Sequence, residues 1–395
     1  MKVSTAGGGA LIAWIVAAQA AAAQPAEPPA DPPVDADEPE PAPRLVGYDQ
    51  GFFLRSADDR FLLRIKGRVQ PFWTYTRIEG DAPNPTAFEI RRARVILEGN
   101  VFGDDWRYRL QFDLGRGDVQ LRDFHWDRRI VDDAWVRAGQ WKRPFSREHI
   151  TSSGRLELTD RSIIDRVFGA GRDIGVAVRN PYEESPPVEW TVGMFNGTGI
   201  EPFQIGILDP VTGEVEITNP INVPFRFRPA FIGRVGVNEG DLKGYSQADL
   251  EGGPLRWAAA ASLWLEGDLD DRDETAQKLE LDYIVKAHGF SSTGGLYAMT
   301  QQVGPRPLAD QEFGVLGFFV QAGYMITPHW QVAARYTFID DSIDDGDDRQ
   351  ELTVGASWYD HRHDAKLQVA VSIFDDPDGD FGDVVLVEVA SQLGF

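Results

Sequence analysis

An alternation of apolar and polar residues is the feature that most constrains what this chain can fold into. It recurs from Phe61 to Phe395 in segments of about ten residues, which clusters of Gly, Asp, Asn and Pro separate. A period of two is typical of β-strands with one apolar and one polar face, and no stretch of comparable length has the period of a helix. The pattern therefore predicts an all-β fold.

The two faces of the predicted strands differ in chemistry. Between Phe61 and Tyr75 the odd positions are mostly apolar or aromatic, whereas the even positions include Arg64 and Lys66. Aromatic residues gather near strand ends, as in the interfacial girdles of membrane barrels, while a soluble β-sandwich would hold more of them in mid-strand. The segments number about sixteen, an even count in the range of water-filled porins. We therefore predict a closed antiparallel transmembrane β-barrel of about 16 strands.

The two ends of the chain indicate export and membrane insertion. Residues 1–23 combine Lys2, an apolar stretch and an Ala-rich run, and this predicts a signal peptide. Residues 24–50 are rich in Pro and acidic residues, which predicts a disordered linker. The barrel domain is expected over residues 51–395. Because strands are the only spanning structure that the pattern allows, we expect the protein in the bacterial cell outer membrane.

The connections between the predicted strands alternate between short and long. Short turns such as 102–105 and 326–329 are expected on the periplasmic side, and longer loops on the outside. The connection 238–254 is too long for this rule, so the strand count stays open by one hairpin.

Charge and composition exclude several classes of protein. Lys and Arg number 39 and Asp and Glu 62, so the net charge is −23, which argues against a general nucleic-acid binder. The chain has no Cys, and this removes disulfides, zinc ribbons and thiol nucleophiles together.

Four motifs stand in the first half of the expected barrel: FEIRRARVILEGNVFGDDWRYRLQFDLG (residues 88–115), LRDFHWDRR, VRAGQWKRPFSREHITSS and DRSIIDR. Together they resemble the phosphate-selective porin O/P family, from about Gly51 through Arg179, and the strand spacing follows more loosely to Phe395. The resemblance implies a sixteen-stranded, usually trimeric outer-membrane channel whose basic lumen passes anions, phosphate or polyphosphate in the named members.

Basic residues dominate the polar face of the predicted strands. The set that we expect to line a path for small anions is Arg64, Lys66, Arg68, Arg92, Arg94, Arg107, Arg109, Arg226, Arg228 and Arg234. A guanidinium group matches the geometry of phosphate oxygens, and a row of individually weak sites lets an anion enter and still leave. The alternative is that these residues pair with nearby acids such as Glu98 and Asp113 and only fill a polar wall. The protein would then be a general or weakly selective porin, or a structural barrel.

The connection from Arg143 to Arg172 is long and, by its position, is the third outer loop. In general porins this loop folds into the lumen and narrows it, and long ordered loops usually have a function. We predict that it does so here, with Arg147, Arg155 and Arg161 at the constriction. A lid on the outer surface is the alternative.

Two acidic clusters, residues 344–348 and 376–383, are expected in outer loops. Bridging by Ca²⁺ or Mg²⁺ is one hypothesis for them, but neither matches a complete calcium-loop signature, so solvated turns are favoured. A secreted or outer-membrane hydrolase is a distant alternative, because His361, His363 and the other histidines show no nucleophile with a spaced base and acid. We therefore predict no enzyme, cofactor or metal site. The expected partners are outer-membrane lipid, small anions and further copies of the chain in a homotrimer, without nucleic acid.

Overall fold

The computed structural model describes residues 45–78, 84–197, 199, 205–208, 215–218, 229–267, 275–302, 312–341, 348–375 and 384–395. The expected signal peptide and most of the expected Pro-rich linker lie outside the described residues. So do residues 344–347 and 376–383 of the two acidic clusters.

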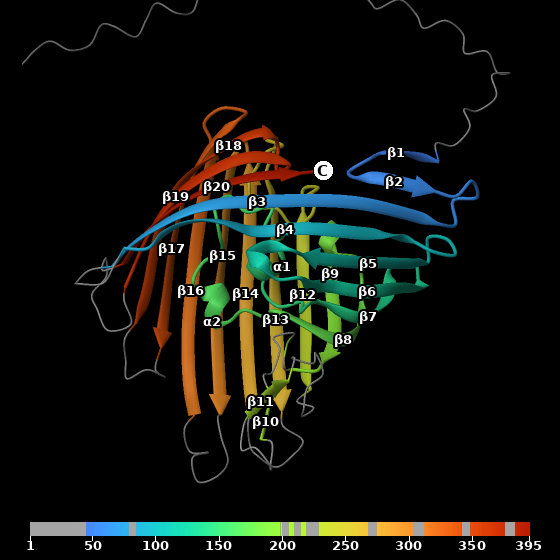
Figure 1. Ribbon diagram of the computed structural model, residues 1–395, viewed down its shortest axis with the longest axis horizontal. Coiled ribbons are helices and arrows are strands. Elements are labelled where there is room, and N and C mark those ends of the chain that lie inside the picture. Colours follow the sequence, from blue (N-terminus) through green and yellow to red (C-terminus); the bar gives the residue numbers. More distant parts are fainter. Residues whose placement is uncertain are drawn as a thin grey trace, which may run out of the picture. The chain divides into compact units, whose positions relative to one another are not determined.

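Sixteen strands of the described part of the chain pair in one closed sheet (Figure 1). They are β3 (Leu62–Ile78), β4 (Thr86–Asn100), β5 (Trp106–Asp113), β6 (Gln120–Val131), β7 (Ala134–Lys142), β8 (Arg172–Arg179), β9 (Val188–Phe195), β12 (Ala230–Glu239), β13 (Arg256–Gly267), β14 (Thr275–Ala287), β15 (Phe290–Gln302), β16 (Glu312–Met325), β17 (Trp330–Asp341), β18 (Arg349–His361), β19 (Ala365–Phe374) and β20 (Val384–Gly394). Each strand pairs antiparallel with the next, and β9 pairs with β12.

The barrel closes between its first and last strands. β20 pairs antiparallel with β3, from Val384 opposite Ile78 to Gly394 opposite Arg68. Beyond this ladder, Phe395 and Gly67 exchange two backbone hydrogen bonds of 3.0 Å. Closure removes the free edges of the sheet, which is the condition for a β-structure to span lipid. The predicted closed antiparallel barrel is confirmed, and its sixteen strands resolve the open question of one hairpin.

A short hairpin precedes the barrel. It consists of β1 (Val46–Tyr48) and β2 (Phe52–Arg55), and β2 pairs with the start of β3, with Phe52 opposite Ile65. β1 lies within residues 24–50, which the sequence analysis assigned to the disordered linker, so ordered structure begins earlier in the chain than that boundary.

The alternation of the sequence becomes two faces of the barrel wall. On β12, Phe231 and Val235 are 51 % and 56 % exposed, whereas Ile232 and Arg234 are 1 % and 3 % exposed. The exposed side chains point away from the barrel because the sheet closes around the others. We call the enclosed side the inner face. An apolar outer face is what contact with lipid tails requires.

The strict alternation breaks at β-bulges, and at two of them the extra residue is an arginine. The β3–β4 register shifts after Gln70, which lies opposite Arg92, while Pro71 lies opposite Ile90, so Arg91 is an extra residue. Pro71 has no N–H to offer to the ladder, which suits a bulge. A second shift, between β5 and β6, makes Arg122 an extra residue in the same way.

The connections at one end of the barrel are mostly short turns: 101–105, 132–133, 180–187, 288–289, 326–329 and 362–364. The exception is 240–255, which joins β12 to β13. We call this end the turn end. At the opposite end, residues 143–171 form the third connection in chain order.

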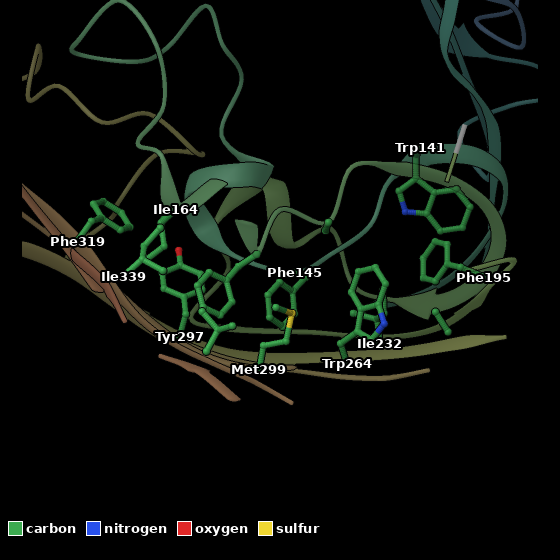
Figure 2. Close-up of a cluster of buried hydrophobic side chains, with 14 of the residues drawn as sticks. Trp141, Phe145, Ile164, Phe195, Ile232, Trp264, Tyr297, Met299, Phe319 and Ile339 are labelled. Atoms are coloured by element: carbon green, nitrogen blue, oxygen red, sulfur yellow. The ribbon is translucent and has the colours of Figure 1, made fainter. Parts of the chain in front are cut away.

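We call residues 143–171 the inserted loop. It contains α1 (Arg147–Ile150) and α2 (Ile164–Val167). Phe145 and Phe168 of this segment are 0 % and 1 % exposed and contact Trp264 and Tyr297 of the wall, with ring centroids 5.9 and 5.2 Å apart. Figure 2 shows this apolar cluster against the strands. The loop is therefore held on the inner face of β13 and β15 by hydrophobic contact.

The remaining elements are the 3₁₀ turns η1 (Gly115–Gly117) and η2 (Tyr182–Glu184), and the hairpin of β10 (Ile205–Leu208) and β11 (Val215–Thr218). None of the helices in the described residues has the length and apolarity that crossing a membrane would need.

Candidate pore interior

The residues that we predicted to line an anion path lie on four strands of the barrel wall, wherever they belong to the described part of the chain. Arg64, Lys66 and Arg68 belong to β3, Arg92 and Arg94 to β4, Arg107 and Arg109 to β5, and Arg234 to β12. All eight occupy the alternating positions of the inner face. Arg226 and Arg228 lie outside the described residues.

On β3 to β8 cations share their carboxylate partners. Glu98 binds Lys66, with 2.6 Å between Nζ and Oε1, and also Arg109. Asp123 binds Arg109 at 3.4 Å and Arg172 at 2.7 Å. Three cations thus share two carboxylates, which leaves this part of the inner face with an excess of positive charge.

Two further cations on this side have no carboxylate within ion-pair distance among the described residues. Arg68 donates to the hydroxyl groups of Ser152 and Ser153 at 3.0 and 2.8 Å. Lys142 donates to the backbone carbonyl groups of residues 149–151, at 2.6 to 3.2 Å. Hydroxyl and carbonyl groups are dipoles without net charge, so these contacts add no negative charge to this part of the inner face.

Arg234 lies in a different electrostatic environment. Its guanidinium contacts Glu189 at 3.1 Å, Glu280 at 3.4 Å and Asp282 at 2.6 Å. Its side chain is 0 % exposed. Surrounded by three carboxylates, Arg234 joins β9, β12 and β14 together and has no free side to offer to a solute.

The basic residues of β3 to β5 also differ from Arg234 in their exposure to solvent. The side chains of Lys66, Arg107 and Arg109 are 26 %, 45 % and 33 % exposed, against 0 % for Arg234. The accessible basic surface of the interior therefore lies on β3 to β5. We call Lys66, Arg68, Arg92, Arg107 and Arg109 the basic strip.

The inserted loop contacts strands on nearly opposite sides of the barrel. Asp160 binds Arg92 of β4 at 3.1 Å, and its carbonyl group accepts a bond of 2.9 Å from Arg335 of β17. The Glu157 carboxylate accepts bonds from Gln321 of β16 at 2.8 Å and from Gln331 of β17 at 2.7 Å. It also accepts one from Ser291 of β15.

The three residues predicted at the constriction are all in this loop, but in different surroundings. Arg147 is 3 % exposed and binds Asp282 at 2.9 Å. Arg161 donates to the carbonyl groups of Glu148 and Thr151 at 2.9 and 2.6 Å, so it stabilises the loop itself. Only Arg155 has an exposed side chain.

Among the carboxyl groups of the inserted loop, Asp160 and Glu148 have pKa values that are shifted in opposite directions. Burial raises the pKa of Asp160, but Arg92 and Arg91 outweigh burial and lower it to about 2. Burial raises the pKa of Glu148 above its ordinary value, against the opposing effect of Arg335. Asp160 is therefore an ionised anchor, whereas Glu148 titrates near neutral pH.

Sequence reasoning missed Arg91 and Arg122 because strict alternation turns odd and even positions to opposite faces. Each is the extra residue of a bulge, and Arg91 binds Asp160 at 3.2 Å beside Arg92. Pro71 was the available signal for the first bulge, since proline in a strand interior marks an irregular ladder.

The described residues contain no group of three or more His, Asp or Glu that could hold a metal ion. His361 binds Asp360, and His363 binds Ser246 at 3.0 Å, so the two histidines have separate partners.

Comparison with known proteins agrees with this barrel wall. The sequence model of the family "phosphate-selective porin O and P" matches residues 63–198, which include the basic strip. The barrel is an outer-membrane porin. The match confirms the resemblance seen in the motifs, and with the closed barrel it places the protein in the bacterial outer membrane.

Solved structures show the same fold. An anion-selective porin from Comamonas acidovorans has a TM-score of 0.55 at 12 % identity, covering 84 % of this chain and 99 % of that chain. The outer-membrane channel DcaP of Acinetobacter baumannii has a TM-score of 0.55 at 13 % identity, covering 84 % and 97 %. OmpT of Vibrio cholerae has a TM-score of 0.53 at 12 % identity, covering 87 % and 100 %. No curated protein sequence matches this chain significantly.

Proposed function

We propose that this porin conducts small anions by passive diffusion, with phosphate and polyphosphate among them, and without a catalytic step. The observation that carries the proposal is the basic strip. Its residues are partly exposed cations of the described inner face. Two of them, Lys66 and Arg109, share only Glu98 and Asp123 with Arg172 among the described residues. An excess of fixed positive charge along a narrow wet path raises the local concentration of anions.

We infer that the inserted loop lies in the lumen and narrows it. Its hydrogen bonds reach β4 on one side and β15 to β17 on the other, and all of these partners belong to the inner face. With the β13–β17 side filled by the loop and its apolar cluster, the open path runs beside β3 to β8. The basic strip lies on that path.

The path attracts anions without trapping them. The strip residues are partly exposed, so water screens each site and no single one binds an anion tightly. Sites such as Glu98 keep two cations in place while neutralising only one charge. A row of such sites allows entry and release, which passive conduction requires.

Charge reversal in the strip tests the proposed ion preference. In planar bilayers under a salt gradient, the double variant Lys66→Glu, Arg109→Glu should change the sign of the reversal potential. Glu98 then loses both of its cations, Asp123 keeps only Arg172, and this part of the strip becomes acidic. Arg60→Glu, in the turn before β3, reverses one charge outside the pore wall and should leave the reversal potential unchanged. An unaltered reversal potential in the double variant would refute the proposed role of the strip. Currents in chloride, in phosphate and with a large cation then rank the solutes.

We further propose that the porin forms a homotrimer. The family resemblance implies this assembly, and one of the similar solved structures, OmpT of Vibrio cholerae, is described in a trimer form, with a TM-score of 0.51 at 11 % identity.

A further inference from the structure

The connection 240–255 differs from the other described connections at the turn end. It is the longest of them, and its side chains are buried: Leu242, Tyr245, Gln247 and Asp249 are at most 5 % exposed. A surface turn of polar residues would be exposed instead. This connection is therefore packed into the protein, and we call residues 241–254 the inner crossbar.

The inner crossbar reaches across the barrel. It starts from β12, and the Tyr245 hydroxyl donates to Glu189 of the neighbouring β9 at 2.8 Å. Gln321 of β16 donates to the Gln247 side chain at 3.1 Å, and Ser246 binds His363, in the turn between β18 and β19, at 3.0 Å. Five strands separate β12 from β18 along the sheet, so these contacts bridge the interior rather than follow the rim.

The inner crossbar also meets the inserted loop. The backbone N–H of Gln247 donates to the carbonyl group of Arg155 at 3.1 Å, and the N–H of Glu157 donates to the Gln247 side chain at 3.0 Å. The Arg147 guanidinium stacks on the Tyr245 ring, 4.5 Å from its centroid. Two segments that enter from opposite ends of the barrel thus join into one partition.

The second half of the inner crossbar is anchored to neighbouring strands and turns. Lys286 of β14 donates to the carbonyl group of Ala248 at 2.8 Å. Asp249 accepts a bond of 2.8 Å from the backbone N–H of Gly289 and binds Arg256. Anchors of this kind hold a segment in one position, as a fixed element of a pore must be held.

We propose that the inner crossbar is a second narrowing element of the pore. Together with the inserted loop it closes the β12–β19 side of the lumen, confines solutes to the β3–β8 side and sets the size limit at the turn end. This inference rests on the proposed conduction through the barrel, but not on the preference for anions.

Removal of the inner crossbar tests the proposal directly. Replacing residues 241–255 by Asn-Gly leaves Gly240 opposite Arg256, which fits the register of β12 and β13 and the preferred sequence of a two-residue hairpin turn. For a variant that keeps the heat-modifiable mobility of a folded barrel, single-channel conductance should rise about twofold, and larger neutral sugars should enter liposomes. Lys243→Ala, an exposed crossbar position with no contact to the inserted loop, is the control and should behave like the parent. A folded deletion variant with unchanged conductance and unchanged size limit would overturn the proposal.

A second experiment keeps the crossbar intact and does not depend on folding of the deletion variant. Because the chain has no Cys, Lys243→Cys introduces a single thiol, and a neutral polyethylene-glycol maleimide labels it from the turn end. The label should reduce conductance by about half. The same label at Pro328→Cys, in the short turn between β16 and β17, should change nothing. Failure of the reagent to reach residue 243, or labelling without loss of current, contradicts the proposal.

The proposed anion conduction and the proposed role of the inner crossbar are tested by different measurements. Loss of ion preference appears in the reversal potential, whereas the inner crossbar is tested by conductance and by the size limit for neutral solutes. A channel without anion preference would refute the proposed function and still respond to removal of the crossbar.

Discussion

At the scale of single residues, Arg91 shows how a bulge creates a buried network. Its guanidinium binds Glu89 at 2.7 Å, Asp160 at 3.2 Å and Glu388 at 2.7 Å, and stacks on Phe72 with 4.0 Å to the ring centroid. It thereby connects β4, the inserted loop and β20. Removing one partner of such a network leaves buried charges without compensation, which costs more than the network contributes in net terms.

Arg91→Met should therefore lower the free energy of unfolding by about 3 kcal/mol, because Glu388, with 6 % of its side chain exposed, then keeps a buried charge without its cation. Adding Glu388→Gln removes that charge and should restore part of the loss. Arg77→Met changes an exposed arginine of β3 and should stay within about 0.5 kcal/mol of the parent. Denaturant unfolding in detergent, followed by tryptophan fluorescence, measures all three variants. A double variant less stable than Arg91→Met would contradict this account.

At the scale of elements, the inserted loop is stabilised by a link between its two helices. The Glu148 carboxylate of α1 accepts bonds of 2.8 and 2.7 Å from the N–H and the hydroxyl of Ser162, which precedes α2. Arg335 of the wall and Asp165 of α2 also influence this carboxyl. Burial raises the pKa of Glu148, so the folded loop favours the protonated form.

The inserted loop should become less stable as pH rises. A carboxyl group whose pKa is higher in the folded than in the unfolded chain contributes stability that is complete below its unfolded pKa, and this contribution is lost as pH rises through the folded pKa. Cleavage after the exposed Arg155 by trypsin, or spontaneous channel closures, should therefore increase from about pH 5 to about pH 8. Glu148→Gln fixes the neutral form and should flatten this dependence. His149 does not explain it, because burial lowers the pKa of His149 to about 4. Equal pH dependence in Glu148→Gln would exclude Glu148 as the titrating group.

At the scale of the whole molecule, charge is distributed unevenly. The chain carries a net charge of −23, yet the accessible inner face of β3 to β5 is basic, while Arg234 is enclosed by three carboxylates on the other side. Net charge is therefore a poor guide to what a barrel conducts, because only the charges along the path act on the solute at close range.

The proposed homotrimer can be tested by measuring the mass of the particle in detergent. Light scattering coupled to size exclusion in mild detergent should find three chains per particle, since the family resemblance implies a trimer. Boiling in SDS should convert the particle to single chains, which serves as the internal control. Single chains in the unheated sample would refute the homotrimer and leave the conduction experiments unaffected.

Much of the barrel could be predicted from the sequence by itself. Alternation with a period of two assigned Phe231 and Arg234 to opposite faces. The lengths of the connections indicated a third outer loop from Arg143 to Arg172, and residues 143–171 are the third connection of their end in the structure. These properties are local, because each strand residue faces either lipid or the interior and neighbouring residues alternate between them. Local sequence therefore encodes the wall and its approximate strand count.

Only the tertiary structure decided which residues fill the interior of the barrel and which partners they contact there. The length of the connection 238–254 was visible in the sequence, but not that Gln247 binds Arg155 of another loop. Likewise, the inward arginines were visible, but not that Arg234 meets three carboxylates while Arg109 and Arg172 share Asp123. Contacts of this kind join residues far apart in the chain, and they depend on barrel closure, on register and on bulges. Periodicity determines the face that a side chain occupies, whereas closure of the barrel determines which side chains meet across it.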